Sequence, residues 1–226
     1  MLAEAAQVGA QLTYWSPWNE PNHPYFLSPQ RGTCAAGAPS LAPAGYAAIA
    51  EALEQALAAA PGDQRLVLGD AAGLLQPTAS ASSVQELIAG LPRELICAST
   101  IWAQHAYIGG PDPVDAVARA LAARGCPSPY TIWITETGVG PAPSDLSGAR
   151  AIADGRKGCE ALQARLRRWY DDPRVSAAFQ YTEREDDRFP TGLVSTDLRR
   201  ARPALAAWTA WGGARAPAAP APAPAC

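Results

Sequence analysis

The sequence predicts an α/β fold in which a parallel sheet is covered by helices. Two observations carry this prediction: β-prone and helical segments alternate five times along the chain, and most of the strand segments are continuous apolar runs. Continuous apolar strands are typical of a sheet buried on both faces, and alternation with helices is typical of parallel strand order. A length of 226 residues and a net charge of -3 suit a globular core.

The first half of the chain contains three β-prone segments and two helical ones. The β-prone segments cover residues 11–16, 65–70 and 99–105, and the helical segments cover residues 44–60 and 83–90. The first helix is rich in Ala, Leu and Glu and is expected to stop at the Pro-Gly pair that follows it. Either Ser82 or Ser83 is expected to cap the second helix. Residues 2–9 resemble the end of a further helix.

The second half of the chain continues the same alternation. Strand-like segments cover residues 130–135 and 175–181, and helical segments cover residues 113–124, 149–170 and 203–211. From residue 214 the chain is an Ala/Pro-rich run, which is typical of an extended linker without a core. We therefore expect one folded domain over residues 1–213 and a disordered tail over residues 214–226.

The spacing of the βα units indicates the type of parallel sheet. Two predicted strands lie between Glu20 and Glu136, which gives about 39 residues per unit, and complete (β/α)8 barrels average about 31 or more. Polar residues follow the strands at Glu20, Asp70, His105, Glu136 and 183–188, where the active sites of such barrels lie. No GxGxxG or GxxxxGK loop of an open nucleotide-binding sheet follows any strand. The sequence therefore predicts a TIM (β/α)8-type barrel.

Only about five of the eight βα units of such a barrel are present. Few residues precede the first predicted strand, so the chain begins around the fourth unit and supplies strands 4–8. Five strands alone would leave two sheet edges with unpaired backbone groups. We therefore expect residues 1–213 to be the C-terminal part of a barrel in an N-terminally truncated chain, with the missing barrel half or a further domain upstream.

Composition and charge exclude several classes of function. The chain has no basic run, which argues against a nucleic-acid partner, and no apolar run long enough for a membrane span. Its first residues lack the charged and apolar regions of a signal peptide. Two histidines are few for a metal-dependent hydrolase, so we expect no metal and no cofactor.

The cysteines are scattered, without a CxxC pair or the spacing of zinc ligands: Cys34, Cys97, Cys126, Cys159 and Cys226. Both free buried thiols and one or two disulfides are compatible with this pattern, the disulfides if the protein is exported. If disulfides form, we expect Cys226 to be the unpaired cysteine.

Two glutamates are candidate catalytic residues. Asn19 and Asn22, the two asparagines of the chain, flank Glu20 where the first predicted strand ends, and Glu136 ends the strand over residues 130–135. A barrel brings the ends of its strands together at one rim. Glycoside cleavage needs one carboxyl group to protonate the leaving oxygen and a second on the opposite face of the sugar. The two glutamates therefore indicate a glycosidase.

Four short motifs follow one another along the chain: Trp18-Asn19-Glu20-Pro21, Gln104-His105-Ala106-Tyr107, the segment 132–138, and the segments 192–194 with 202–204. The first resembles the Asn-Glu-Pro motif that ends the fourth strand of the clan A retaining glycoside hydrolases. The segment 132–138 resembles the nucleophile motif of that clan's seventh strand. The others resemble its sixth strand and the region after strand eight. The resemblance covers residues 10–212 and implies a cellulase- or xylosidase-like barrel.

The resemblance also implies a role for each candidate residue. Glu20 is then the general acid/base and Glu136 the nucleophile of a double-displacement reaction on a β-linked carbohydrate. Asn19 binds the sugar 2-hydroxyl, Tyr107 donates to Glu136, and His105 bonds a carboxylate or a sugar hydroxyl. The candidate stacking platforms for sugar rings are Trp15, Trp18 and Trp102. The full-length protein is then expected outside the cell or on its surface.

Each of these residues also has a purely structural interpretation. A glutamate at a strand end is commonly a solvated charge, Asn22 fits a turn, and His105 fits a hydrogen-bonded core position. Tryptophans are more often core residues than platforms, and the acidic run from Glu183 to Asp187 fits a solvated loop. The alternative function is therefore a catalytically inactive, truncated barrel that at most binds carbohydrate.

Overall fold

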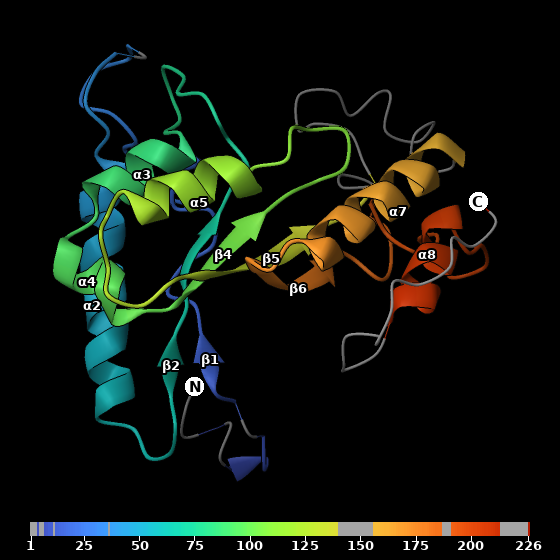
Figure 1. The fold of residues 1–226 in the computed structure, drawn as a ribbon, viewed down its shortest axis with the longest axis horizontal. Helices are drawn as coiled ribbons and strands as arrows, with labels where there is room; N and C mark the ends of the chain where they lie inside the picture. The colour runs from blue at the N-terminus through green and yellow to red at the C-terminus, as the bar shows by residue number, and fades with distance from the viewer. Residues whose placement is uncertain are drawn as a thin grey trace. The chain divides into compact units, whose positions relative to one another are not determined.

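The computed structural model describes residues 4, 7–10, 12–35, 37–139, 156–186, 191–212 and 226. The chain divides into two compact units. Unit 1 is made of Met1–Gln104 and Pro113–Trp133, and unit 2 is made of His105–Asp112 and Ile134–Cys226. The helices and strands of both units are labelled in Figure 1.

Unit 1 contains two pairs of parallel strands. β1 (Tyr14–Trp15) pairs with β2 (Arg65–Leu66), and β3 (Leu68–Ala71) pairs with β4 (Ile101–His105). The start of β5 (Thr131–Thr137) lies next to β4. These parallel pairs confirm the α/β class, with strands where the sequence predicts them.

The strand predicted over residues 65–70 is two strands in the structure. β2 and β3 lie on either side of Val67 and pair with different neighbours. Within β3, the register against β4 shifts between Gly69 and Ala71. Gly69 has φ +98°, and a Cβ there would lie 2.4 Å from the carbonyl oxygen of Ala103. Only glycine therefore fits this close approach of two strands.

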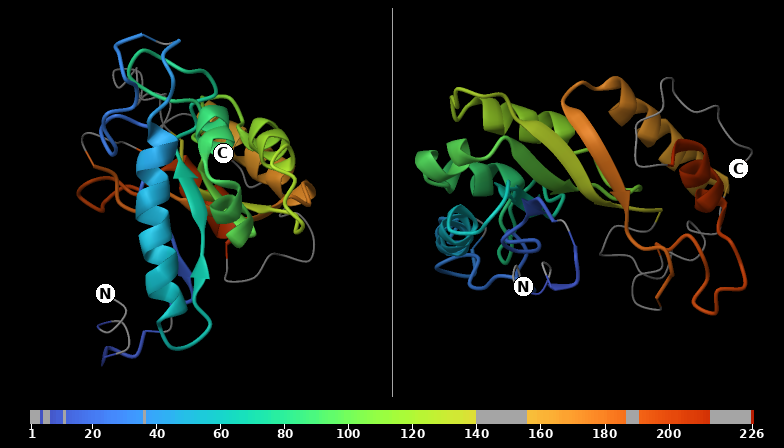
Figure 2. Two further views of the ribbon diagram at one scale, coloured as in Figure 1. Left: turned by 90° about the vertical axis from the view of Figure 1, so that its left-hand side faces the viewer. Right: turned by 90° about the horizontal axis from the view of Figure 1, so that it is seen from below.

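The helices described in unit 1 are α2 (Ala42–Ala58), α3 (Val84–Gly90), α4 (Arg93–Ala98) and α5 (Val114–Ala122). α2 lies beside β2, and α3 packs against both α2 and α5 (Figures 1 and 2). α4 is an addition to the predicted elements. It has six residues, too few for the periodicity of a helix to be recognised in a sequence.

Side chains fix two of these helices. The Oγ of Ser83 accepts a hydrogen bond from the N–H of Glu86, whose carboxylate accepts the N–H of Ser83, so Ser83 is confirmed as the cap of α3. On α2, the fully buried Tyr46 accepts a hydrogen bond from the N–H of Gly69 at 2.8 Å. Burial raises the pKa of the Tyr46 hydroxyl, so it stays protonated and ties α2 to β3.

Unit 2 is built around the end of β5. Its other described elements are β6 (Val175–Gln180), α7 (Arg156–Asp171) and α8 (Pro203–Trp211). β6 is the neighbour of β5, and α7 packs against both β6 and α8 (Figures 1 and 2). The predicted strand over 175–181 and helix over 203–211 are confirmed.

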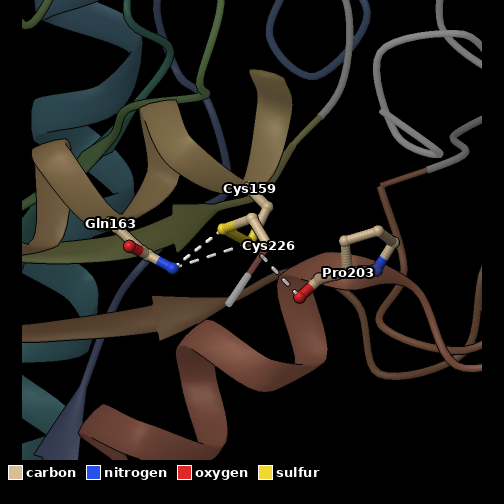
Figure 3. Close-up of a disulfide and its surroundings, with 4 residues drawn as sticks. All are labelled: Cys159, Gln163, Pro203 and Cys226. Atoms are coloured by element: carbon tan, nitrogen blue, oxygen red, sulfur yellow. Dashed lines mark hydrogen bonds between the residues drawn. A yellow bond between two sulfur atoms is a disulfide. The ribbon is translucent and has the colours of Figure 1, made fainter. Parts of the chain in front are cut away.

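Two disulfides correct the expectation for the cysteines. Cys97 is bonded to Cys126 in unit 1, and Cys159 is bonded to Cys226 in unit 2. Figure 3 shows the second disulfide between α7 and the chain terminus, with Gln163 and the carbonyl of Pro203 beside it. The prediction that Cys226 stays unpaired is wrong, because the free cysteine is the exposed Cys34.

The acidic run that begins at Glu183 is only partly a solvated loop. Glu183 and Asp186 are exposed, but Glu185 is buried and forms an ion pair with the buried Arg202, whose Nε lies 2.9 Å from the Glu185 Oε2. A Cβ on Gly192 would lie 2.1 Å from the Glu185 nitrogen. The prediction of a solvated charge is therefore wrong for Glu185. Its partner Arg202 lies further along the chain and pairs with it in the interior.

The described residues do not show the predicted barrel. The strands of the described residues form a two-stranded and a four-stranded sheet, and they do not close into a barrel. Residues 149–155 of a predicted helix, and 214–225 of the predicted tail, lie outside the described part of the chain. Among the helices that the structure describes, none has the length and apolar character needed to cross a membrane.

Candidate active site

Glu136 lies near the end of β5 in unit 2, and two side chains contact its carboxylate. The hydroxyl of Tyr107 donates a hydrogen bond to Glu136 Oε2 at 2.6 Å. The Nδ1 of His105 lies 3.2 Å from the same oxygen, and the His105 side chain is 1% exposed against 20% for Glu136. A carboxylate held at one oxygen by two neighbours has a fixed orientation, and donors directed at it favour its charged form.

The backbone explains why these three residues meet. The N–H of Ala106 donates to the carbonyl of Glu136 at 2.9 Å, so the chain that leaves β4 runs beside the end of β5. The Thr137 hydroxyl adds a hydrogen bond to the Ala106 carbonyl at 2.7 Å. Residues 105–107 are therefore held against residues 136–137 by main-chain and side-chain bonds.

Gly138 continues this tight arrangement beyond β5. A Cβ at this position would lie 2.7 Å from the carbonyl oxygen of Tyr181 and 3.0 Å from the Cβ of Thr191. The carbonyl of Gly138 accepts the N–H of Ile108 at 3.0 Å. The order Glu-Thr-Gly in this sequence therefore has a structural reason, because a larger residue after Thr137 would push the chain away from β6.

Glu20 in unit 1 has an unusual backbone conformation. It has φ +42°, in the left-handed region that non-glycine residues rarely adopt. Its N–H donates to the carbonyl of Asp70 at 2.8 Å, and Asp70 itself has φ +49°. Glu20 is half-buried. Strained backbone of this kind persists only where the surrounding structure fixes it, and it is found often at functional sites.

The two asparagines beside Glu20 differ in their surroundings. Asn22 is fully buried; its side chain donates to the carbonyls of Ala72 and Ser82 at 3.1 and 3.2 Å and accepts the Ala72 N–H at 2.8 Å. This confirms the structural interpretation of Asn22. Asn19 is half-buried, and its role in binding a sugar stays a prediction.

The three candidate stacking residues also differ in exposure. Trp18 is 45% exposed, and its indole N–H donates to the carbonyl of Phe26 at 2.8 Å. Trp15 is half-buried and donates to Gln64 at 2.6 Å. Trp102 is fully buried and donates to Gln104 at 3.2 Å. Trp18 thus offers the most open ring surface, and Trp102 has the packing of a core residue.

The sequence reasoning missed two features near Glu20. One is the hydrogen bond from the Glu20 N–H to the carbonyl of Asp70, a residue predicted only as a polar position after a strand; the Gly-Asp pair at the end of an apolar segment is a signal for a turn. The other is a pair of exposed aromatic residues, Tyr25 and Phe26. Their signal was the presence of two adjacent aromatic rings within a loop rich in proline.

Comparisons with known proteins show that the fold of this chain is similar to that of solved structures. No protein-family model and no curated protein matches the chain. Among solved structures, it is similar to a GH128 (subgroup II) endo-β-1,3-glucanase from Sorangium cellulosum, with a TM-score of 0.57 and 16% identity over 95% of this chain and 77% of that one. It is also similar to a GH39 β-xylosidase from Caulobacter crescentus, with a TM-score of 0.57 and 18% identity over 92% of this chain and 44% of that one.

These identities are low, so the likeness concerns the fold. The chain has an α/β fold with parallel strands that is similar to the fold of glycoside hydrolases. It spans less than half the length of the β-xylosidase chain. Fold likeness alone does not assign an activity, so the function has to be argued from the candidate residues.

Proposed function

We propose that the chain is part of a retaining glycoside hydrolase that cleaves a β-linked carbohydrate. In this proposal Glu136 is the nucleophile and Glu20 the general acid/base of a clan A enzyme with a (β/α)8 barrel. The observation that carries the proposal is the contact of Tyr107 and His105 with one carboxylate oxygen of Glu136. The fold likeness to glycoside hydrolases supports it.

The surroundings of Glu136 suit a nucleophile. In double displacement, a carboxylate attacks the anomeric carbon and forms a glycosyl–enzyme ester, which water then hydrolyses. This carboxylate has to be charged and correctly oriented before the substrate arrives. The short hydrogen bond from Tyr107 and the adjacent His105 support this role for Glu136.

Glu20 is assigned the complementary role. The acid/base gives a proton to the leaving oxygen in the first step and removes a proton from water in the second. Asn19, its neighbour in the sequence, is proposed to bond the sugar 2-hydroxyl, an interaction that strengthens in the transition state. Trp18, with its exposed ring, is proposed to contact a sugar face.

Removal of the nucleophile tests the proposal most directly. Glu136→Ala should abolish hydrolysis of an aryl β-glycoside, and added azide should restore turnover by attacking the anomeric carbon in place of Glu136. The product is then a glycosyl azide of inverted anomeric configuration, which NMR identifies. Glu51→Ala, at an exposed position on α2, is the matched control and should keep full activity. Unchanged hydrolysis by the Glu136 variant would contradict the proposal.

We also propose that the protein acts outside the cell. The two disulfides support this, because disulfides persist mainly in oxidising compartments. Immunodetection in the culture medium and in washed cells of the source organism tests it. The protein should appear in the medium or on the cell surface, and recovery only from the cytosol would contradict this.

A further inference from the structure

The loop that follows β1 carries a cluster of rings, which we call the aromatic loop: Trp18, His23, Tyr25 and Phe26. Three of these side chains are open to solvent: Tyr25 is 89% exposed, Trp18 is 45% exposed and Phe26 is 42% exposed. The loop belongs to unit 1 and lies at the end of that unit toward which the arrows of β1 and β2 point in Figure 1.

The rings of the aromatic loop are held together. The indole N–H of Trp18 donates to the carbonyl of Phe26, so Trp18 and Phe26 are tied across the loop. The ring of His23 packs edge-to-face with that of Tyr25, with centroids 4.9 Å apart, and lies 6.0 Å from that of Phe26. The His23 Nδ1 also accepts the Tyr25 N–H at 3.4 Å. The exposed surface is therefore organised before any ligand binds.

The base of the loop is anchored by a buried side chain. Gln30 is 3% exposed, and its amide donates to the carbonyls of Pro21 and Leu27 at 2.8 and 2.7 Å. At the other end, the N–H of His23 donates to the carbonyl of Glu20 at 2.9 Å. The aromatic loop is thus joined directly to the backbone of the candidate acid/base.

We propose that the aromatic loop binds a sugar ring on the leaving-group side of a glycan chain. Part of this rests on the proposed function: the general acid protonates the leaving oxygen, so residues joined to it lie on the leaving-group side. The apolar C–H face of a pyranose ring matches an exposed aromatic surface. Isolated exposed aromatics need no explanation, but three within nine residues, fixed by hydrogen bonds beside Glu20, form a binding surface.

The substrate class follows from this placement. A sugar bound by the aromatic loop belongs to the part of the chain that departs when the bond is cleaved. The preferred substrate is therefore an oligosaccharide or polysaccharide with a sugar as leaving group, and small aryl glycosides use only part of the site.

A binding experiment tests the aromatic loop without any turnover. The double variant Tyr25→Ala/Phe26→Ala is made in a Glu136→Gln background, and calorimetry measures binding of a β-1,3-linked glucose hexasaccharide and a β-1,4-linked xylose hexasaccharide. We expect one of them to bind and the double variant to weaken this binding about tenfold, the scale of about 1.4 kcal/mol for lost aromatic contacts. Phe179→Ala, which removes another exposed ring, is the matched control and should bind normally.

Equal binding by the double variant and its parent, or no binding of either hexasaccharide, overturns the proposal. Thermal melting confirms that each variant is folded. Tyr25→Phe in the Glu136→Gln background keeps the aromatic ring and should therefore bind the hexasaccharide as the parent does. A chain that binds through these rings but hydrolyses nothing supports the aromatic loop and contradicts the proposed glycosidase activity.

Kinetics test the leaving-group side. With Glu136 intact, the double variant should have a kcat/KM about tenfold lower for the hexasaccharide that binds, and an unchanged kcat/KM for the corresponding glycosyl fluoride. Fluoride is too small a leaving group to reach the aromatic loop. An equal loss on both substrates overturns the assignment to the leaving-group side.

Discussion

The ends of β1 and β5 present the same type of residue in opposite ways. At the end of β5, Glu136 has regular strand backbone, and its carboxylate is contacted by Tyr107 and His105. After β1, Glu20 has a left-handed backbone fixed by the Asp70 carbonyl. The contacts described here thus act on the carboxylate of Glu136 and on the backbone of Glu20.

This difference suits the roles proposed for the two residues. A nucleophile performs one attack from one position, so contacts to its carboxylate assist it. An acid/base gives up a proton in the first step and takes one from water in the second, so its side chain has to serve both steps. In this proposal the backbone of Glu20, fixed by the Asp70 carbonyl, places the acid/base for both steps.

The largest expected effect separates the two glutamates by leaving group. Glu136→Gln should lower kcat/KM on every substrate by at least about 10⁴-fold, as removal of a nucleophile does. Glu20→Gln should lower it about 10²- to 10⁴-fold on substrates with a poor leaving group. It should cost much less on a dinitrophenyl glycoside, whose leaving group needs no proton. Steady-state kinetics on both substrates measure this, and an identical pattern for the two variants would show that the roles are not divided.

Removal of the hydrogen bond from Tyr107 to Glu136 should have the next largest effect on activity. Tyr107→Phe removes a hydrogen bond to a charged group, worth about 1.5–3 kcal/mol, so kcat/KM should fall about 10- to 100-fold. The acid limb of the pH–rate profile should also move upward, because Glu136 is then less stabilised as the anion. Tyr14→Phe, at an exposed position, is the control. A fall in activity without any change in the pH profile would assign Tyr107 a purely structural role.

Substitution of Asn22 tests how much the buried hydrogen bonds near Glu20 contribute to stability. Asn22→Ala removes three bonds to the backbone of Ala72 and Ser82 and should lower the free energy of unfolding by about 3 kcal/mol. Asn19→Ala, at a half-buried position, should cost less than about 1 kcal/mol. Urea denaturation measures both values, and equal losses would show that Asn22 has no special structural part.

Glycine substitution tests the backbone difference itself. Glu20→Gly relieves a left-handed conformation and should leave stability unchanged or raise it by about 1 kcal/mol, whereas Glu136→Gly weakens a strand and should lower it by about 1 kcal/mol. Both variants should lose activity. Urea titrations provide the comparison, and a destabilised Glu20→Gly would argue against strain at that position.

The smallest expected effect is a pH-dependent change in stability on substitution of Glu86, whose carboxylate lies outside the candidate site. Burial alone would raise its pKa, but hydrogen bonds from Arg31 and Ser83 outweigh this and hold it below 4.5, its ordinary value. Because the pKa is lowered on folding, the stabilisation is present above that value and is lost as the pH falls through the folded pKa. The difference in stability between wild type and Glu86→Gln should therefore be below about 1 kcal/mol at neutral pH and shrink as the pH is lowered below 4.5. A difference that is independent of pH would contradict this.

The sequence predicted those features that local chemistry determines. The β-prone run over residues 130–135 marked β5 and placed Glu136 near its end, and the serine pair Ser82-Ser83 marked the cap of a helix. The bond from Tyr107 to Glu136 came from a resemblance of motifs, and the structure contains it. The catalytic roles of these residues stay proposals.

Features that depend on distant partners were not predictable in this way. Glu185 looked solvated because its partner Arg202 lies 17 residues further on. The pairing of Cys226 with Cys159 depends on a separation of 67 residues. The left-handed backbone of Glu20 depends on Asp70, which no pattern around Glu20 reveals. In each case the folded chain, and not the local sequence, supplies the contact.

The bond between Cys159 and Cys226 has a consequence for proteolysis. It makes the chain between these cysteines a closed covalent ring. A protease that cuts one peptide bond inside the ring releases no fragment, because both new ends stay joined through sulfur. Cut and intact protein would therefore differ on a denaturing gel only after the disulfides are reduced.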